Sequence, residues 1–193
     1  MRQLIFATGN INKIKEVNEM LSDGMDIAGL KDIGCFEDIP ETSPTIEGNA
    51  LQKARYVFTN YHVNCFSEDT GLEIDALGGE PGVYTARYAG EQRDSNANMR
   101  KAIQELENKS DRGAQFKTVI ALIIDGQEYT FEGIARGSIA YQKMGTGGFG
   151  YDPIFIPEGY ETSFAQMSSE EKNKISHRGK AVSLLIDFLK KEL

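Results

Sequence analysis

The sequence predicts a mixed α/β domain, a central β-sheet flanked by helices, over residues 1–193. Short apolar runs typical of strands alternate with segments of helical periodicity along the whole chain. The length suits one domain or two closely packed lobes, and no repeat or low-complexity linker interrupts it. Hydrophobic residues at 40% and charged residues at 26% are ordinary values for a globular protein. We therefore expect a single domain.

The first 60 residues predict a βαβ unit followed by a long helix. Residues 4–7 are typical of a short buried strand, and residues 26–30 of a second one. The helix between them has an apolar face made of Ile14, Val17, Met20 and Leu21. An acidic loop over 32–44 follows, and Thr45 is placed to cap a helix over 46–60.

The remaining residues predict further strands and two more helices. Residues 64–69 enter a turn, residues 72–75 alternate like a strand, and Asp94 or Ser95 caps a helix that runs to about residue 107. Two strands over 116–125 and 128–136 are joined by Gly126-Gln127, a hairpin signal of the Gly-X kind. A strand over 151–156, a Ser168…Glu171 capping box and a closing helix over 176–193 complete the chain.

Charge and cysteine usage exclude several classes of protein. Twenty-one basic and 29 acidic residues give a net charge of −8, which argues against non-specific binding to nucleic acid. Cys35 and Cys65 stand apart from any metal or redox motif, as expected of reduced structural thiols in a cytosolic protein. No apolar stretch approaches the ~20 residues of a membrane span. We expect a soluble, cytoplasmic protein without nucleic-acid or membrane partners.

The segment Thr8-Gly9-Asn10, followed by Lys13, is a candidate phosphate site. It runs from a strand into a helix, whose N-terminus offers free N–H groups and a partial positive charge. The alternative is that Asn10 only caps the helix. The sequence lacks a Walker P-loop.

Two acidic segments are candidate metal or catalytic groups. Glu41 lies in a loop before a helix, and Glu68-Asp69 is expected at a strand end. Mg²⁺ in nucleotide enzymes takes one or two carboxylates plus substrate phosphates, and a carboxylate can also activate a water. Solvated acidic turns are the alternative, and spacing does not choose among the acids.

Residues 145–152 and 172–178 combine glycines, aromatic rings and hydrogen-bonding groups. Phe149 can stack on a flat ring, Asp152 can accept hydrogen bonds, and His177 and Arg178 can donate them. The glycines would clear space beside a bound base. The pattern Gly145-x-Gly147-x-x-Gly150 has the wrong context for a dinucleotide fold, because a strand rather than a helix is predicted after it. A surface or capping histidine is the alternative for His177.

Five blocks together resemble the inosine triphosphate pyrophosphatase (Ham1/RdgB) family, the non-canonical purine NTP (XTP/dITP) diphosphatases. The blocks occur in family order and span the chain: residues 8–13, 68–72, 76–84, 145–155 and 171–179. The resemblance implies hydrolysis of ITP, dITP and XTP to the monophosphate and pyrophosphate with Mg²⁺. It also implies an elongated mixed sheet, two lobes with the active site in the cleft between them, and a homodimer.

The resemblance also assigns roles to individual residues. Asp69 would bind Mg²⁺ and act as base for the attacking water, with Glu41 as the second metal carboxylate and Glu68 as the alternative to Glu41. The residues implied to bind substrate are Thr8, Gly9, Asn10, Ile11, Asn12, Lys13, Lys53, Thr70, Arg87, Phe149, Gly150, Tyr151, Asp152, Lys172, His177 and Arg178.

A pocket lined by donors such as Arg178 and His177 would pair with the 6-oxo group of hypoxanthine or xanthine. The amino group of adenine would face donors there, and an unpaired buried polar group costs about 1–3 kcal/mol. Two other functions remain: a Maf-like pyrophosphatase for other modified nucleotides, and a nucleotide sensor without activity, which would be expected to lose Asp69 or the Lys13/Lys53 pair.

Overall fold

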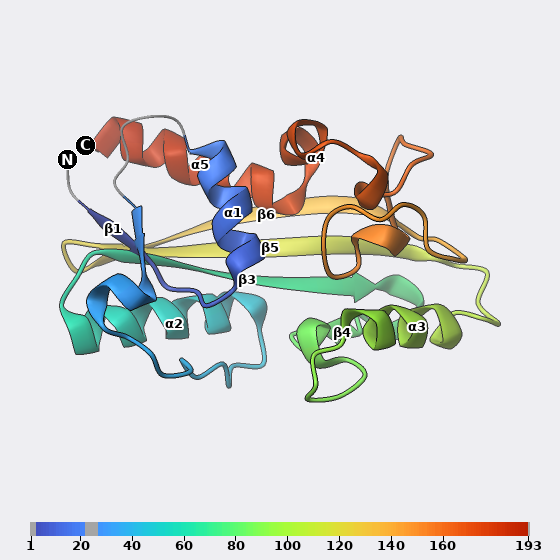
Figure 1. The fold of residues 1–193 in the computed structure, drawn as a ribbon, viewed down its shortest axis with the longest axis horizontal. Coiled ribbons are helices and arrows are strands. Elements are labelled where there is room, and N and C mark those ends of the chain that lie inside the picture. The colour runs from blue at the N-terminus through green and yellow to red at the C-terminus, as the bar shows by residue number, and fades with distance from the viewer. Residues whose placement is uncertain (1–2, 22–26, 193) are drawn as a thin grey trace. The chain divides into compact units, whose positions relative to one another are not determined.

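The computed structural model of the chain describes residues 3–21 and 27–192. Helices and strands alternate as the sequence predicts (Figure 1). The helices are α1 (Ile11–Met20), α2 (Ile46–Tyr61), α3 (Ser95–Glu105), α4 (Ser169–Ile175) and α5 (His177–Glu192). The strands are β1 (Leu4–Phe6), β2 (Ile27–Gly29), β3 (Cys65–Ile74), β4 (Pro81–Gly82), β5 (Gly113–Ile124), β6 (Gln127–Ile139) and β7 (Phe155–Pro157).

Within the described residues, seven strands form one mixed sheet of order β2-β1-β3-β5-β6-β7, with β4 paired to β3. Strand β1 is parallel to both β2 and β3, which confirms the opening βαβ unit. Strand β4 is antiparallel to β3, and β7 is antiparallel to β6. The chain therefore has the predicted fold class, a mixed sheet with flanking helices.

The chain divides into two compact units. Unit 1 comprises Met1–Asp69, Thr118–Gly133 and Arg178–Leu193, and unit 2 comprises Thr70–Lys117 and Ile134–His177. Three of the four boundaries fall inside strands β3, β5 and β6. The single domain expected over residues 1–193 stays a prediction.

Unit 1 has helices on both faces of its strands (Figure 1). On one face, Val17 of α1 and Ala181, Val182, Leu185 and Leu189 of α5 share a buried core with strand residues such as Phe66. On the other face, the side chains of Cys65 and Ser67 donate hydrogen bonds to backbone carbonyls of α2. Side chains of a strand alternate between its faces, so each face of β3 meets different helices.

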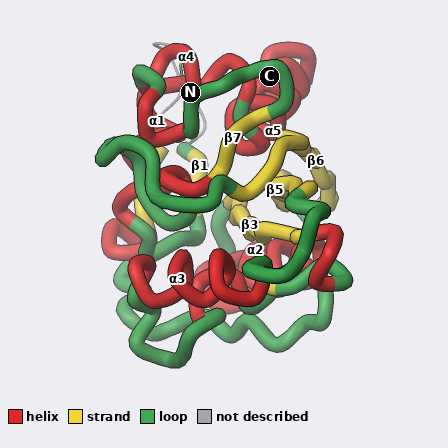
Figure 2. The backbone as a smooth tube through the Cα atoms, turned by 90° about the vertical axis from the view of Figure 1, so that its right-hand side faces the viewer, coloured by secondary structure: helices red, strands yellow, loops and turns green. Residues whose placement is uncertain are grey.

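Unit 2 has its own core, in which α3 packs against the second half of β3. Met99, Ala102 and Leu106 of α3 join Leu72 and Ile74 there, and α3 is the red coil below β3 in Figure 2. The same core holds a cluster of rings, the ring cluster: Phe116, Phe155, Phe164 and His177.

The predicted helix starts are confirmed at the level of single hydrogen bonds. Thr45 Oγ1 accepts from Gly48 N at 3.0 Å, and the Asp94 carboxylate accepts from Asn96 N at 2.8 Å. Ser168 and Glu171 form the expected reciprocal capping box. The closing helix begins at His177, and Leu193 lies outside the described residues, as does Asp26 of the predicted second strand.

Two of the strand predictions were wrong. Residues 65–74 form one continuous strand, so Glu68 and Asp69 lie in its middle, not in a turn at its end. The polar run over residues 67–70 does not look like a buried strand in the sequence, because the residues that pair with Glu68 and Asp69 come close to them only in the folded protein. The segment 152–154 is a turn of 3₁₀-helix, and only Phe155–Pro157 is a strand.

The predicted Gly-X hairpin turn was also wrong by one residue. The two central residues of the turn are Asp125 and Gly126, with φ of 50° and 79°. Positive φ at both central positions defines a type I′ turn, for which Asp-Gly is a preferred pair. The flanking strands begin or end beyond the predicted bounds, at Gly113 and Ile139.

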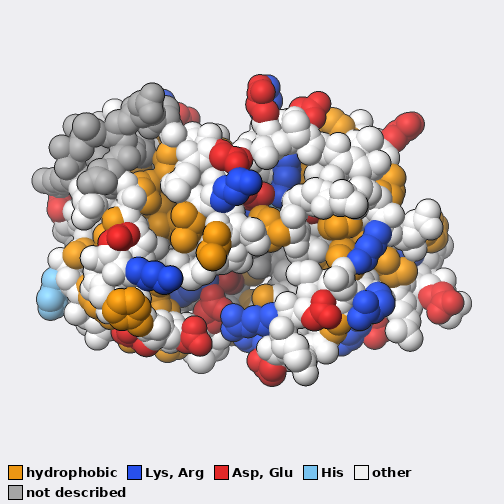
Figure 3. All heavy atoms as spheres, in the orientation of Figure 1, with side chains coloured by type: hydrophobic (Ala, Val, Ile, Leu, Met, Phe, Trp, Pro, Cys, Tyr) orange, Lys and Arg blue, Asp and Glu red, His pale blue; other side chains and the backbone are white. Residues whose placement is uncertain are grey.

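None of the helices in the described part of the chain has the length and apolar character needed to cross a membrane. On the face drawn in Figure 3, basic and acidic side chains lie interspersed among the described residues.

Candidate functional site

The strand–helix junction at residues 8–13 is built by its own side chains. Asn10 Oδ1 accepts from the backbone N–H groups of Asn12 (3.0 Å) and Lys13 (3.4 Å), and Asn10 N donates to Thr8 Oγ1 (3.2 Å). Asn10 therefore caps α1, which confirms the alternative interpretation given for it from the sequence. Phosphate binding here stays a prediction. Ile11, the first helical residue, is 79% exposed.

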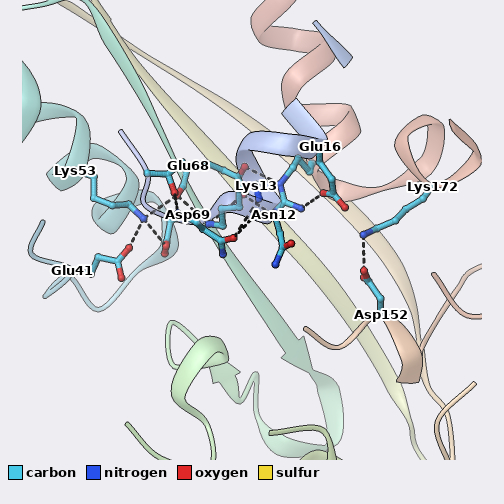
Figure 4. Close-up of polar contacts among 12 residues, drawn as sticks. Asn12, Lys13, Glu16, Glu41, Lys53, Glu68, Asp69, Asp152 and Lys172 are labelled. Carbon is cyan, nitrogen blue, oxygen red and sulfur yellow. Dashed lines mark hydrogen bonds and ion pairs between the residues drawn. The ribbon is translucent and has the colours of Figure 1, made fainter. Parts of the chain in front are cut away.

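The alternation of side chains along β3 sends its two carboxylates to opposite faces. Asp69 follows Cys65 and Ser67 on the α2 face, and Glu68 follows Phe66 on the face covered by α1 and α5. The carboxylates of the two adjacent acids therefore belong to two neighbouring clusters (Figure 4), which meet at the Glu68 carbonyl, where both Lys13 and Lys53 donate.

The α2-side cluster consists of Glu41, Lys53 and Asp69. Lys53 Nζ donates to Asp69 Oδ1 at 3.1 Å, to Glu41 Oε1 and to the Glu68 carbonyl at 2.9 Å. Burial alone would lower the pKa of Lys53, but the Asp69 and Glu41 carboxylates outweigh it and raise that pKa. Burial raises the pKa of Asp69, and the charge of Glu41 adds to this, against the opposing effect of Lys53 and Lys13.

The α5-side cluster consists of Lys13, Glu16, Glu68 and Arg178. The Arg178 guanidinium donates to both oxygens of Glu68, from Nε at 2.8 Å and from Nη2 at 2.7 Å, and also to Glu16 Oε2. Lys13 Nζ lies 3.3 Å from Glu68 Oε1. The side chains of Glu68 and Arg178 are 0% and 2% exposed, so the pair at the centre of this network is buried, whereas Lys13 and Glu16 are partly exposed.

The α5-side cluster shifts the ionisation of its cations in opposite directions. Burial lowers the pKa of Lys13, and the positive charges of Lys53 and Arg178 add to the effect, while Glu68 opposes it. For Arg178, burial is outweighed by the carboxylates of Glu68 and Glu16, which raise its pKa. Arg178 is therefore a fixed cation.

Unit 2 carries the Lys172–Asp152 ion pair, with 2.7 Å between Lys172 Nζ and Asp152 Oδ2 (Figure 4). Asp152 Oδ2 also accepts from Phe149 N at 2.8 Å, and Lys172 Nζ lies 5.1 Å from the centre of the Phe149 ring. The His177 ring stacks on Phe116 of the ring cluster, with 4.4 Å between centroids. The sequence did not predict Phe116 as a site neighbour.

The glycines of residues 145–152 make room chiefly for the protein itself. A Cβ at Gly148, where φ is +66°, would lie 2.1 Å from the Asp152 carboxylate, and one at Gly147 would lie 2.8 Å from Ala165 O. At Gly147 and Gly148 the protein itself fills the space that the sequence interpretation assigned to a base, while base binding near this segment stays a prediction. Gly150 differs, because a Cβ there would meet nothing within 4 Å.

The other predicted substrate residues lie as follows. Thr70 is on β3 next to Asp69. The Tyr151 hydroxyl donates to Thr85 O at 2.9 Å, and the Arg87 guanidinium lies 5.3 Å from the centre of the Tyr84 ring. Gly9 lies in the junction before α1, with nothing within 4 Å of a Cβ. The predicted substrate-binding residues belong partly to unit 1 and partly to unit 2.

Sequence reasoning did not name Glu16 as a site residue. The available signal was its spacing of three residues from Lys13, which puts the two side chains on one helix face. The structural role of Glu68 was also missed, because its partner Arg178 lies 110 residues away in sequence.

The described residues contain no group of three or more His, Cys, Asp or Glu side chains placed to hold a metal. Glu41 and Asp69 share one cation, Lys53, which puts two carboxylates in one place. Two carboxylates fit Mg²⁺, which takes its remaining ligands from substrate phosphates and water.

The sequence profile of the Ham1 family matches residues 4–188. The chain belongs to the Ham1 family. A relative named dITP/XTP pyrophosphatase, from Flavobacterium psychrophilum, is 58% identical over 97% of this chain and 99% of its own. One of the same name from Bacillus subtilis is 46% identical over 98% of each. The solved Ham1 protein of Staphylococcus aureus is 38% identical, with a TM-score of 0.91 over the full length of both chains.

Proposed function

We propose that this Ham1 protein hydrolyses non-canonical purine nucleoside triphosphates (ITP, dITP and XTP) to the monophosphate and pyrophosphate. The observation that carries the proposal is the α2-side cluster, two carboxylates around one lysine at the end of the unit 1 part of β3. The names of the relatives at 58% and 46% identity support the same reaction.

We assign the metal to Glu41 and Asp69. Glu41 is the better second ligand, because both oxygens of Glu68 already accept from Arg178. The Glu41 side chain is 34% exposed, whereas that of Glu68 is fully buried. A bound Mg²⁺ would supply charge neutralisation at the phosphate oxygens.

Asp69 would act as the base. A carboxylate held beside the attacking water can take its proton. Water oxygen attacks the α-phosphorus, its proton passes to Asp69, and the bond from the α-phosphorus to the bridging oxygen breaks. Pyrophosphate leaves with the electron pair of that bond. The Lys13 and Lys53 ammonium groups would stabilise the charge that builds on the phosphate oxygens.

We assign binding of the nucleobase to unit 2. Phe149 offers a ring for stacking, and the Lys172–Asp152 pair offers hydrogen-bonding groups beside it. His177, in the same unit, stacks on Phe116 and is a further candidate donor. A donor facing the 6-oxo group of the base would disfavour adenine by about 1–3 kcal/mol. Arg178, which the sequence suggested for the same task, has its donors on Glu68 and Glu16, so we assign it to ordering the phosphate side.

We further propose a cytoplasmic homodimer that binds no nucleic acid, with purine nucleotides as its substrates. The net charge of −8 supports the absence of a nucleic-acid partner. Light scattering on the purified protein tests the dimer.

The first test is pyrophosphate release with Mg²⁺ from ITP, dITP, XTP, GTP, ATP and dTTP. Selective turnover of the first three, with matching monophosphate, is the expected result. Turnover of dTTP in preference to them would favour a Maf-like activity. Nucleotide binding without any turnover would favour a sensor.

A further inference from the structure

The loop that carries Glu41 has no helix or strand of its own, yet two side chains of α2 hold its backbone. Thr42 N donates to Gln52 Oε1 at 2.9 Å, and Ser43 N donates to Asn49 Oδ1 at 2.8 Å. Gln52 Nε2 in turn donates to Thr42 Oγ1 at 3.0 Å. The two residues that follow Glu41 are therefore fixed by three hydrogen bonds to one helix.

The two amide side chains lie on the same side of α2 as Lys53. Residues 52 and 53 lie three and four positions after residue 49, the spacings that place helical side chains together. Asn49 is only 3% exposed. Helix α2 thus holds the loop backbone through Asn49 and Gln52 and holds the Glu41 carboxylate through Lys53.

We propose that Asn49 and Gln52 are positioning residues that hold the Glu41 carboxylate near Asp69, with which it shares Lys53, so that both carboxylates can bind one divalent metal. This inference rests on the assignment of Glu41 as a metal carboxylate under the proposed function. Without these hydrogen bonds the loop could adopt many conformations, and binding a metal would have to restrict them. Anchoring the loop to α2 lowers the conformational entropy that metal binding costs. Residues that orient metal ligands typically contribute about 10–100-fold to metal affinity.

The test compares Gln52→Leu with Arg55→Ala. Arg55 lies on the same helix three residues later, where it pairs with Glu128 at the surface. It therefore controls for any general effect of changing an α2 side chain. Mg²⁺ affinity is measured by calorimetry, with and without a non-hydrolysable ITP analogue. The Mg²⁺ concentration for half-maximal turnover is measured in parallel.

We expect Gln52→Leu to weaken Mg²⁺ binding about 10-fold and to raise the half-maximal Mg²⁺ concentration equally. The kcat at saturating Mg²⁺ should stay near the wild-type value. Gln52→Glu keeps an acceptor for Thr42 N and should recover most of the loss. Asn49→Ala should act in the same direction, and thermal melting identifies any loss that comes from unfolding of this buried position.

The proposal is overturned if Gln52→Leu binds Mg²⁺ within about twofold of Arg55→Ala. It is also overturned if the wild type binds no Mg²⁺ with or without the analogue. A wild type that binds Mg²⁺ but releases no pyrophosphate would instead refute the proposed function, while the affinities of the variants still decide the positioning role.

Discussion

The buried cations of the two units lie in different surroundings. In unit 1, Lys53 lies between two carboxylates and Arg178 between two others. In unit 2, Lys172 pairs with Asp152, and rings of Phe149 and Phe164 lie 5.1 and 5.7 Å from its ammonium group. A network of several charges suits a ligand with several charges, such as a triphosphate with its metal. One ion pair beside rings suits a flat, neutral base.

The largest expected effect is loss of turnover in Asp69→Asn. The amide keeps the shape of Asp69 but cannot take a proton from water, so we expect kcat with ITP to fall about 10³-fold. Nucleotide binding, measured by calorimetry, should remain. Asp75→Asn is the matched control, since Asp75 pairs at the surface with Arg136 and should be replaceable. Wild-type kcat in Asp69→Asn would remove Asp69 from the mechanism.

The difference between the units is tested most directly by the free energy of unfolding of two variants, one in each unit. Arg178→Met leaves the fully buried Glu68 without its bidentate partner, for which we expect a loss of about 3–5 kcal/mol in the free energy of unfolding. Lys172→Met removes one hydrogen bond from Asp152, which still accepts from Phe149 N. We expect about 1–3 kcal/mol there. Urea unfolding followed by circular dichroism measures both, since the chain has no tryptophan.

The same unfolding curves test whether the chain is one domain. A single transition that both variants shift would support one cooperative domain, as the sequence predicts. Two transitions, each shifted by one variant only, would mean that the units unfold separately. Equal losses in the two variants would contradict the difference between the units drawn above.

The smallest expected effect is that of Lys53→Met on the protein without metal. The ammonium of Lys53 offsets the repulsion between Glu41 and Asp69, so its removal should cost about 1–2 kcal/mol. Because Mg²⁺ can replace that charge, adding it should raise the melting temperature more in Lys53→Met than in the wild type. Lys53→Arg keeps the charge and serves as control. If Mg²⁺ raised the melting temperature of all three proteins equally, Lys53 would not belong to the metal site.

Local structure was predictable wherever neighbouring residues decide it. Thr45, Asp94 and the Ser168…Glu171 pair all cap helices as expected, because an N-cap bond spans only two or three residues. The prediction failed where a polar run in a strand is stabilised from far away. Glu68 and Asp69 look like turn residues until Arg178 and Lys53 are brought to them.

The candidate site was predictable as a set of residues but not as an arrangement. Lys13, Lys53, Asp69 and Glu41 were all named from sequence, and the structure brings Lys53, Asp69 and Glu41 together. Sequence could not place Glu16 beside Arg178, nor the glycines of residues 145–148 against Asp152 and Ala165. Those contacts depend on segments that meet only after folding.

By itself, the sequence determined the fold class, most helix starts and the chemical kinds of the site residues, since these follow from periodicity, capping and side-chain type. The tertiary structure decided which acidic side chain pairs with which basic one. The alternation of β3 sends Asp69 to the helix that carries Lys53, and it sends Glu68 to the helices that carry Lys13 and Arg178. Two adjacent acids thus take different roles because successive side chains of a strand point to opposite faces.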